Sequence, residues 1–295
     1  MLTVAGIPVT EHQLMMAKAA GINEIVLATS YLSEVFTPYF GDGSKWGMSI
    51  KYAVEKEPLG TGGAIANAAQ LLDTKESIVI LNGDVLSAHD LSEQIRQHEA
   101  NDADVTLHLT QVEDARPFGC VPTDAQGRVT AFLEKMENPV TNQINAGCYV
   151  FNPRVISAIP VQTVVSVERD TFPKLVSDGA KVYGYLENAY WLDIGTPKAL
   201  LKASTDIVLR SGPGLVMPGA QVDATAEIIG GSSIGPDSSV GASTRIDGSI
   251  VEAGSVIGRD VVIENSFVAT GAIITDGTKI RSSFVTKEEI LPIPA

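Results

Sequence analysis

Residues 1–208 alternate between short apolar runs and longer segments with the hydrophobic spacing of amphipathic helices. Gly21 follows one helical segment, at the position expected for a helix C-cap. Such alternation predicts an open, mostly parallel α/β sheet with helices on both faces, which binds ligands beyond the carboxyl ends of its strands. The pattern predicts strands over residues 25–29, 49–54, 77–81 (with both faces buried), 104–110, 129–133 and 148–151, and helices over residues 11–20, 61–72 and 90–100.

A different pattern begins after the turn-rich segment Ser211-Gly212-Pro213-Gly214. Aliphatic residues recur there every six positions, with Gly, Ser, Asp and Thr between them. This period predicts a parallel β-helix of hexapeptide repeats with the aliphatic side chains inside, and the alternative is a Gly/Ser-rich linker with scattered valines. The repeat positions are Val216, Val222, Ile228, Ile234, Val240 and Ile246, and then, after a shortened turn at Ile250, Val256, Val262, Val268, Ile274 and Ile280.

These patterns divide the chain into a first domain over residues 1–210, a β-helix over residues 215–285 and a tail over residues 286–295. A β-helix ends in an open coil with unpaired backbone groups. Residues 287–295 offer little apolar cover for that end. We therefore expect a homo-oligomer that assembles through the β-helix.

Composition excludes several classes of protein. The chain is 44% hydrophobic, which is typical of a globular protein, and its formal net charge of -14 opposes binding to nucleic-acid phosphates. A small anionic substrate remains possible, because a bound cation can reverse the local charge. Cys120 and Cys148 lie in apolar runs and are interpreted as free core thiols. The absence of a long apolar run or a leader predicts a cytoplasmic protein without a membrane partner.

Five motifs of polar residues and glycine flank the predicted strands and helices. Glycines between a strand and a helix allow backbone N–H groups to approach a ligand, and an aspartate after a central strand is well placed to bind a metal ion. Each motif alone also has an ordinary structural explanation, namely steric need for glycine, an Asx turn or a solvated ion pair. The motifs are E-K-E-P-L-G-T-G-G at residues 55–63, N-G-D at 82–84, E-K at 134–135, N-A-G at 145–147 and W-L-D-I-G-T-P at 191–197.

Together with F-G-C-V at residues 118–121, these motifs stand in the order and separation found in one enzyme family. Over nearly its whole length the chain resembles the sugar-1-phosphate nucleotidyltransferases, most closely mannose-1-phosphate guanylyltransferases that end in a left-handed β-helix. The resemblance implies a Rossmann-like nucleotidyltransferase sheet. It also implies that a sugar 1-phosphate, with mannose 1-phosphate favoured, attacks the α-phosphorus of a nucleoside triphosphate, with GTP favoured, and releases pyrophosphate.

The resemblance also implies roles for individual residues. Asp84 and Asp193 match two carboxylates that bind a metal ion, for which Mg²⁺ is the expected cofactor, and we expect them to lie close together at one end of the sheet. Lys135 matches the lysine that meets the sugar phosphate, and it completes the catalytic set of Asp84, Lys135 and Asp193. The sugar-phosphate site comprises Gly119, Glu134, Lys135 and Asn145, and the nucleotide site comprises Glu55, Gly60, Thr61, Gly62 and Asp84, with Glu55 and Gly60 facing the base.

One departure from the family concerns its G-x-G-T-R loop, which wraps the triphosphate. Residues 1–8 resemble the segment that follows this loop, and no other glycine-rich loop in the sequence replaces it. We expect the sheet to lack its first strand, which leaves two strands with unpaired edges. We also expect the chain as given to be nearly or wholly inactive, because positioning and charge neutralisation provide most of phosphoryl-transfer catalysis.

Other functions remain open from the sequence. One alternative is a noncatalytic regulatory subunit that binds a sugar nucleotide, and another is a glucose-1-phosphate thymidylyl- or uridylyltransferase. A hexapeptide-repeat acyltransferase needs a histidine base near its coils. All four histidines precede the repeats, so the β-helix is interpreted as structural; they are His12, His89, His98 and His108. Arg169 could touch an anionic ligand, although a salt-bridged helix start is favoured.

Overall fold

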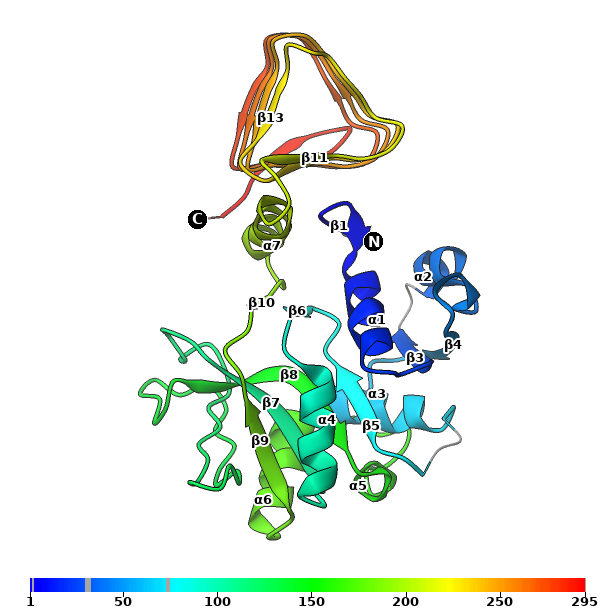
Figure 1. Ribbon diagram of the computed structural model, residues 1–295, viewed down its shortest axis with the longest axis vertical. Helices are drawn as coiled ribbons and strands as arrows, with labels where there is room; N and C mark the ends of the chain where they lie inside the picture. Colours follow the sequence, from blue (N-terminus) through cyan, green and yellow to red (C-terminus); the bar gives the residue numbers. More distant parts are fainter. Residues whose placement is uncertain (2, 30–32, 73–74, 295) are drawn as a thin grey trace. The chain divides into compact units, whose positions relative to one another are not determined.

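The computed structural model describes residues 1, 3–29, 33–72 and 75–294 (Figure 1). The chain forms two compact units. The first comprises Met1 with Gln13–Trp191, and the second comprises Leu2–His12 with Leu192–Ala295. Both the mixed α/β class and the C-terminal β-helix that the sequence predicts are confirmed.

A two-stranded parallel sheet lies near the start of the first unit. In this sheet β3 (Glu24–Thr29) pairs with β4 (Ser49–Val54) along its whole length. α1 (Val9–Ala19) precedes β3, and the φ of +82° at Gly21 agrees with the predicted C-cap. α2 (Ser33–Phe40) and η1 (Ser44–Trp46) connect the two strands and enclose a small apolar core with them.

The second sheet of this unit has four strands in the order β5-β8-β7-β9. Its strands are β5 (Ile78–Leu81), β7 (Val105–Gln111), β8 (Gln143–Phe151) and β9 (Val182–Leu186). β8 is antiparallel to both β5 and β7, whereas β9 is parallel to β7, so β8 alone runs against the common direction. Among the described residues, β3 and β5 each pair along one edge only.

Helices cover both faces of this sheet, as predicted. Leu107 and Leu109 of β7 face a core that includes residues of α3 (Gly60–Ala69), α5 (Pro153–Ser157) and α6 (Phe172–Ser177). Thr106 of β7 faces the other side, where its hydroxyl lies 3.0 Å from Nδ1 of His98 on α4 (Leu91–Ala100). The period-2 alternation of β7 therefore separates an apolar layer from a more polar one.

Three sequence predictions for this unit need correction. Residues 129–133 form no strand but only isolated bridges, including Thr123↔Val129 and Cys120↔Leu133. β8 begins at Gln143, so the N-A-G motif lies inside the strand rather than before it. β5 is only partly buried, since it is an edge strand.

The β-helix of the second unit is built from three parallel sheets, which appear as stacked triangular coils in Figure 1. It follows α7 (Pro197–Leu209), which begins at the N-cap Thr196. The first sheet contains β11 (Gly214–Val216), β14 (Ser232–Ile234), β17 (Ile250–Val251), β20 (Phe267–Val268) and β23 (Ser283–Val285). The second contains β12 (Gln221–Val222), β15 (Ser239–Val240), β18 (Val256–Ile257) and β21 (Ile273–Ile274), and the third contains β13 (Glu227–Ile229), β16 (Arg245–Asp247), β19 (Val262–Glu264) and β22 (Lys279–Arg281).

The repeat is not strictly six residues, and this corrects the predicted register. Later coils advance by 17 residues, as in the pair Ile250↔Phe267, because one corner of each is a residue shorter. Neighbouring side chains on a strand point to opposite faces, so a shift of one residue turns an inward side chain outward. Val256 is therefore 46% exposed and Ile257 is buried, and Ile263 rather than Val262 belongs to the apolar core. The remaining inward residues include Ile234, Val240, Ile246, Val251, Val268, Ile274, Ile280 and Val285.

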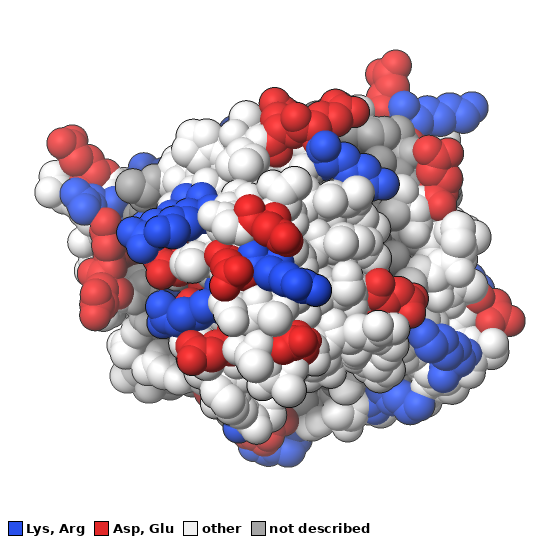
Figure 2. Space-filling view, turned by 90° about the horizontal axis from the view of Figure 1, so that it is seen from above, with Lys and Arg blue, Asp and Glu red and all other residues white. Residues whose placement is uncertain are grey.

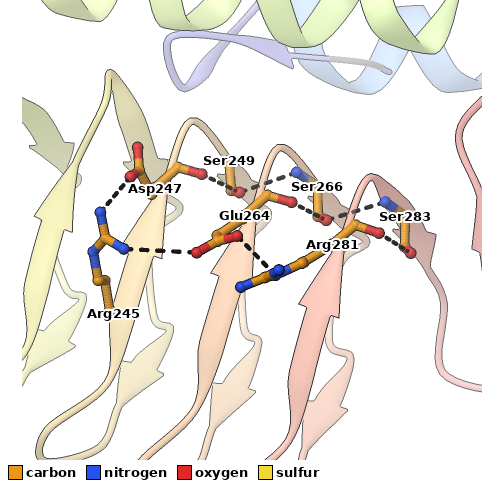
Figure 3. Close-up of polar contacts among 7 residues, drawn as sticks. All are labelled: Arg245, Asp247, Ser249, Glu264, Ser266, Arg281 and Ser283. Atoms are coloured by element: carbon orange, nitrogen blue, oxygen red, sulfur yellow. Dashed lines mark hydrogen bonds and ion pairs between the residues drawn. The ribbon is translucent and has the colours of Figure 1, made fainter. Parts of the chain in front are cut away.

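Serine side chains close the shortened corners (Figure 3). The Ser249 hydroxyl donates to the Asp247 carbonyl at 2.8 Å and accepts from the Ser266 N–H of the next coil at 3.0 Å. Ser266 repeats this arrangement with Glu264 and Ser283. The serines thus form a ladder along the β-helix that satisfies backbone groups at each corner.

Both ends of the chain add to the second unit. β1 (Thr3–Val4) and β2 (Ile7–Pro8) form a hairpin, in which the Ala5 N–H donates to the Ser204 hydroxyl of α7 at 3.0 Å. β24 (Ile290–Pro292) pairs antiparallel with β23 and closes one of the three sheets at the last coil. The expected tail therefore contributes a strand, although Ile290 and Leu291 remain 55% and 43% exposed. Among the described helices, none has the length and apolar character needed to cross a membrane.

Candidate active site

Two of the predicted motifs meet at the carboxyl end of β5. The Asn82 N–H donates to the Gly147 carbonyl at 2.8 Å, which joins the N-G-D turn to the N-A-G segment of β8. Gly147 has a φ of +74°, and a Cβ there would lie 3.0 Å from Val85 Cγ2, so this junction requires glycine. Asp84 is exposed on the turn between β5 and β6 (Val85–Ser87), at the edge of the sheet where such folds bind ligands.

The amide of Asn145 is held from two sides. Its Nδ2 donates to the Tyr149 hydroxyl at 2.9 Å, and its Oδ1 accepts from the Gly147 N–H at 3.2 Å. Asn145 is half-buried, whereas Tyr149 is fully buried. Tyr149 lies in an apolar run, so nothing in the sequence indicated that its hydroxyl contacts the candidate site.

Three of the residues expected to hold the sugar come together in the first unit. The Asn145 N–H donates to the Gly119 carbonyl at 3.0 Å. A Cβ on Gly119 would lie 3.2 Å from Oε2 of Glu134, so Gly119, Glu134 and Asn145 form one cluster. Lys135 follows as an exposed residue with a φ of +36°, which is uncommon for a residue with a side chain and is found preferentially at functional sites.

Trp191 supports this cluster from the last predicted motif. Its indole N–H donates to the Ala146 carbonyl at 2.9 Å, and its ring meets Phe118 edge-on at 5.5 Å. The N-A-G segment is therefore fixed both by the indole and by the junction with the N-G-D turn.

Glycines at the start of α3 have a structural explanation. The Gly62 and Gly63 N–H groups donate to the Val165 carbonyl at 2.8 and 3.3 Å. Cβ atoms on Gly60 and Gly63 would lie 2.6 Å from the Val165 oxygen and 2.4 Å from the Thr163 oxygen. The backbone donors of Gly62 and Gly63 are thus already used within the chain, while contacts of Gly60, Thr61 and Gly62 with a nucleotide stay a prediction.

Two further hydrogen bonds connect Thr61 of α3 with the segment that follows Val165. The Thr61 hydroxyl accepts from the Val167 N–H at 2.8 Å and donates to Oε2 of Glu168 at 2.7 Å. Glu168 lies on the π-helical turn η2 (Val167–Thr171), a conformation found frequently at functional sites. No ion pair of Arg169 is present in the described part of the chain, since the Asp170 carboxylate accepts from the Ser166 N–H instead. The salt-bridged helix start favoured from the sequence is therefore not found among the described residues.

A buried carboxylate oxygen lies just after β4. Oε2 of Glu55 accepts from the Leu59 N–H at 3.2 Å, while Oε1 is buried without a hydrogen-bond partner in the described structure. The Thr29 hydroxyl, at the end of β3, is likewise buried and unpartnered there, and the Glu55 N–H donates to the Thr29 carbonyl. Buried polar atoms without partners are costly, so this place suits a ligand that supplies a donor.

Asp193 belongs to the second unit, at the end of β10 (Trp191–Asp193). Its Oδ1 accepts from the Gly195 N–H at 2.9 Å, which orients the carboxylate as an Asx turn does. Within the described ranges, no three His, Cys, Asp or Glu side chains gather as a metal site. A metal ion held by only two carboxylates would not form such a group of three. The metal site of Asp84 and Asp193 therefore stays a prediction.

A buried polar layer on the α4 side of the sheet contains groups that do not ionise readily. His89 and His108 stack with ring centroids 3.8 Å apart. Burial and the neighbouring His89 lower the pKa of His108 to about 3, and burial lowers the pKa of His89. Burial also raises the pKa of the Cys148 thiol, and both Cys120 and Cys148 are free and buried, as predicted.

Comparison with known proteins identifies the family. The model of a family described as nucleotidyl transferase matches residues 1–209. Mannose-1-phosphate guanylyltransferase from Mycobacterium tuberculosis is 48% identical over 258 residues, which cover 84% of this chain and 72% of that protein. Mannose-1-phosphate guanylyltransferase 1 from Arabidopsis thaliana is 35% identical over 247 residues, covering 79% of this chain and 68% of that protein.

A solved structure has a similar fold. The crystal structure of HddC from Yersinia pseudotuberculosis complexed with GMP-PN matches with a TM-score of 0.60 and 26% identity, covering 70% of this chain and 88% of that chain. The chain belongs to the nucleotidyl transferase family. The regulatory-subunit and thymidylyl- or uridylyltransferase alternatives are not favoured by these relatives.

Proposed function

We propose that the site in this chain serves the transfer of the guanylyl group of GTP to mannose 1-phosphate, which forms GDP-mannose and pyrophosphate. The observation that carries the proposal is the cluster of Gly119, Glu134 and Asn145, in a chain 48% identical to a protein named mannose-1-phosphate guanylyltransferase. The Glu134 carboxylate and the Asn145 amide offer acceptors and donors for sugar hydroxyls. Lys135 next to Glu134 brings the positive charge that a sugar phosphate requires.

Guanine recognition is assigned to Glu55. Guanine presents two adjacent donors, the ring N–H and the exocyclic amine, which a carboxylate can accept. Uracil and thymine instead place carbonyl oxygens beside their single N–H, and a carboxylate repels these. The buried, unpartnered Oε1 of Glu55 supports this role, and Gly60, Thr61 and Gly62 at the start of α3 complete the proposed nucleotide site.

The metal-binding role is assigned to Asp84 and Asp193, with Mg²⁺ as the cofactor. The residues fit such an ion, because carboxylate oxygens are the hard ligands that Mg²⁺ prefers. When bound, Mg²⁺ neutralises phosphate charge during the transfer. The hydrogen bond from Gly195 holds the Asp193 carboxylate in one orientation, and the exposed position of Asp84 leaves it accessible to solvent and ions.

Ligand binding tests the proposed substrates directly. Isothermal titration calorimetry of the full chain with MgCl₂ would compare mannose 1-phosphate with glucose 1-phosphate, and GTP with dTTP. We expect each first-named ligand to bind at least about tenfold more tightly, which corresponds to roughly 1.4 kcal/mol. Release of pyrophosphate from GTP and mannose 1-phosphate, measured in a form of the protein that carries the G-x-G-T-R loop, is the second readout. Equal binding of GTP and dTTP, or of the two sugar phosphates, would refute the proposed specificity.

Self-association through the β-helix is proposed as well. On its second sheet, Val256 and Ile273 are paired neighbours with 46% and 71% of their surfaces exposed. In the described part of the last coil, β24 covers only the edge of β23. Light scattering should report a multimer for the full chain and a smaller mass for Ile273→Glu than for the control Lys279→Glu. A monomeric full chain at micromolar concentration would contradict this.

A further inference from the structure

The hydroxyl of Tyr149 contacts the N-A-G motif of the candidate active site. It accepts from Nδ2 of Asn145 at 2.9 Å, and Oδ1 of the same amide accepts from the Gly147 N–H at 3.2 Å. Asn145 belongs to the proposed sugar site, and the neighbouring Gly147 carbonyl accepts from the Asn82 N–H of the turn that carries Asp84. One buried oxygen therefore holds an amide that belongs to the proposed sugar site.

Chemistry fixes the orientation of the Asn145 amide. A backbone N–H can only donate, so the atom that faces the Gly147 N–H must be Oδ1, and Nδ2 must then face Tyr149. These two bonds use one N–H and one lone pair of the amide. The amide has another N–H and another lone pair, which are a donor and an acceptor for sugar hydroxyls.

Tyr149 itself has little freedom to move. Its side chain is 0% exposed, and its ring meets Phe172 edge-on at 5.0 Å and Phe151 edge-on at 6.2 Å. Burial, and next the negative charge of Glu168, raise the pKa of Tyr149, so that the hydroxyl stays protonated at neutral pH. A rigid, neutral hydroxyl is suited to holding other side chains rather than to exchanging protons with a substrate.

We propose that Tyr149 is a positioning residue, which holds the Asn145 amide in the orientation that binds the sugar of the sugar 1-phosphate. This rests on the proposed function. Without the hydroxyl, Nδ2 of Asn145 loses its partner and the amide can rotate about its side-chain bonds. The sugar phosphate then meets an amide that it must order itself, which weakens binding. GTP, whose proposed contacts are elsewhere, binds as before.

Tyr149→Phe tests the role, because it removes only the hydroxyl and keeps the ring in the core. Isothermal titration calorimetry should show mannose 1-phosphate binding about five- to tenfold more weakly, the scale of one hydrogen bond, with GTP binding unchanged within about twofold. The control is Tyr185→Phe, which removes the bond from another largely buried tyrosine hydroxyl to Glu187, at 2.7 Å, away from the motifs. It should lower the melting temperature by a similar amount without weakening mannose 1-phosphate binding.

A double-mutant cycle separates this inference from the proposed function. If Tyr149 acts through Asn145, then Tyr149→Phe adds no further loss in the Asn145→Ala background. Full additivity of the two losses, or unchanged binding by Tyr149→Phe alone, would overturn the positioning role while leaving the sugar site intact. If Asn145→Ala alone leaves mannose 1-phosphate binding unchanged, the proposed sugar site fails, and the role of Tyr149 fails with it.

Discussion

The serine ladder of the β-helix predicts a large effect from a very small substitution. Ser249→Ala removes one buried oxygen that serves two backbone groups, the Asp247 carbonyl and the Ser266 N–H (Figure 3). Ser249 is 0% exposed, so water cannot easily replace the hydroxyl. A buried donor left without a partner costs about 1–3 kcal/mol. Since the carbonyl loses a partner as well, we expect Ser249→Ala to lower the free energy of unfolding of the β-helix by about 2–3 kcal/mol.

Ser239→Ala provides the matched control. Ser239 lies on β15 of the same β-helix, and its hydroxyl makes no hydrogen bond to any described residue. Loss of this partly exposed hydroxyl should therefore change stability by less than about 0.5 kcal/mol. The comparison isolates the ladder, because both substitutions convert a strand serine of the β-helix to alanine.

Urea unfolding of the full chain can resolve the effect. Both tryptophans, Trp46 and Trp191, precede the β-helix, so tryptophan fluorescence follows the first unit. Far-UV circular dichroism follows both units. Ser249→Ala should shift the circular-dichroism transition assigned to the β-helix and leave the fluorescence transition in place. If Ser249→Ala and Ser239→Ala unfold at the same urea concentration, the ladder does not stabilise the corners and the reasoning is wrong.

Four further outcomes can be checked separately. Glu55→Gln should reduce the preference for GTP over dTTP in calorimetry, because an amide presents both a donor and an acceptor to the base; an unchanged ratio would exclude Glu55 from base recognition. Asp84→Asn should lower kcat about a hundredfold, measured by pyrophosphate release in a form of the protein that turns over, and activity within about threefold of the parent would contradict the metal role. The pKa of His108 is about 3 in the folded state, whereas in the unfolded state it is near the usual value for histidine, about 6.5. As the pH drops from about 6.5 toward 3, the unfolded state therefore binds a proton that the folded state does not. The free energy of unfolding should fall by up to about 1.4 kcal/mol per pH unit over this range. Urea titrations of the parent and of His108→Phe at several pH values would test this, and equal slopes would refute it. Gly63→Ala should destabilise the first unit, since a Cβ would lie 2.4 Å from the Thr163 carbonyl oxygen, and an unchanged fluorescence melting curve would show that the segment yields easily.

The face drawn in Figure 2 carries charged side chains of both signs. Basic and acidic side chains alternate across it, without a broad area of one sign. On the third sheet of the β-helix, Arg245 contacts Asp247 at 2.7 Å and Glu264 at 3.6 Å, and Glu264 contacts Arg281 at 2.8 Å. Ion pairs of this kind neutralise charge locally on that sheet.

The local pattern of the sequence was sufficient to predict several strands and a helix end of this protein. The residues of β4 coincide with the predicted strand, and β3 and β7 differ from prediction by a residue at their ends. Gly21 ends α1 as expected. Such features depend on the period and the capping residues of one segment, which the sequence contains in full. The six-residue repeat is equally local, because each coil contacts only its neighbours.

Tertiary structure decided what depends on distant residues. The shortened corners exchanged Val256 for Ile257 inside the β-helix, because a one-residue change reverses which side chains point inward. The glycines of α3 are explained by Thr163 and Val165, about a hundred residues away in sequence, and no local rule relates them. In the same way, the period of β8 marks Tyr149 as a buried aromatic residue. Only the packing of β8 beside the Asn82 turn determines that its hydroxyl lies within the candidate active site, because a hydrogen bond depends on where two segments meet in space rather than on the pattern of either one.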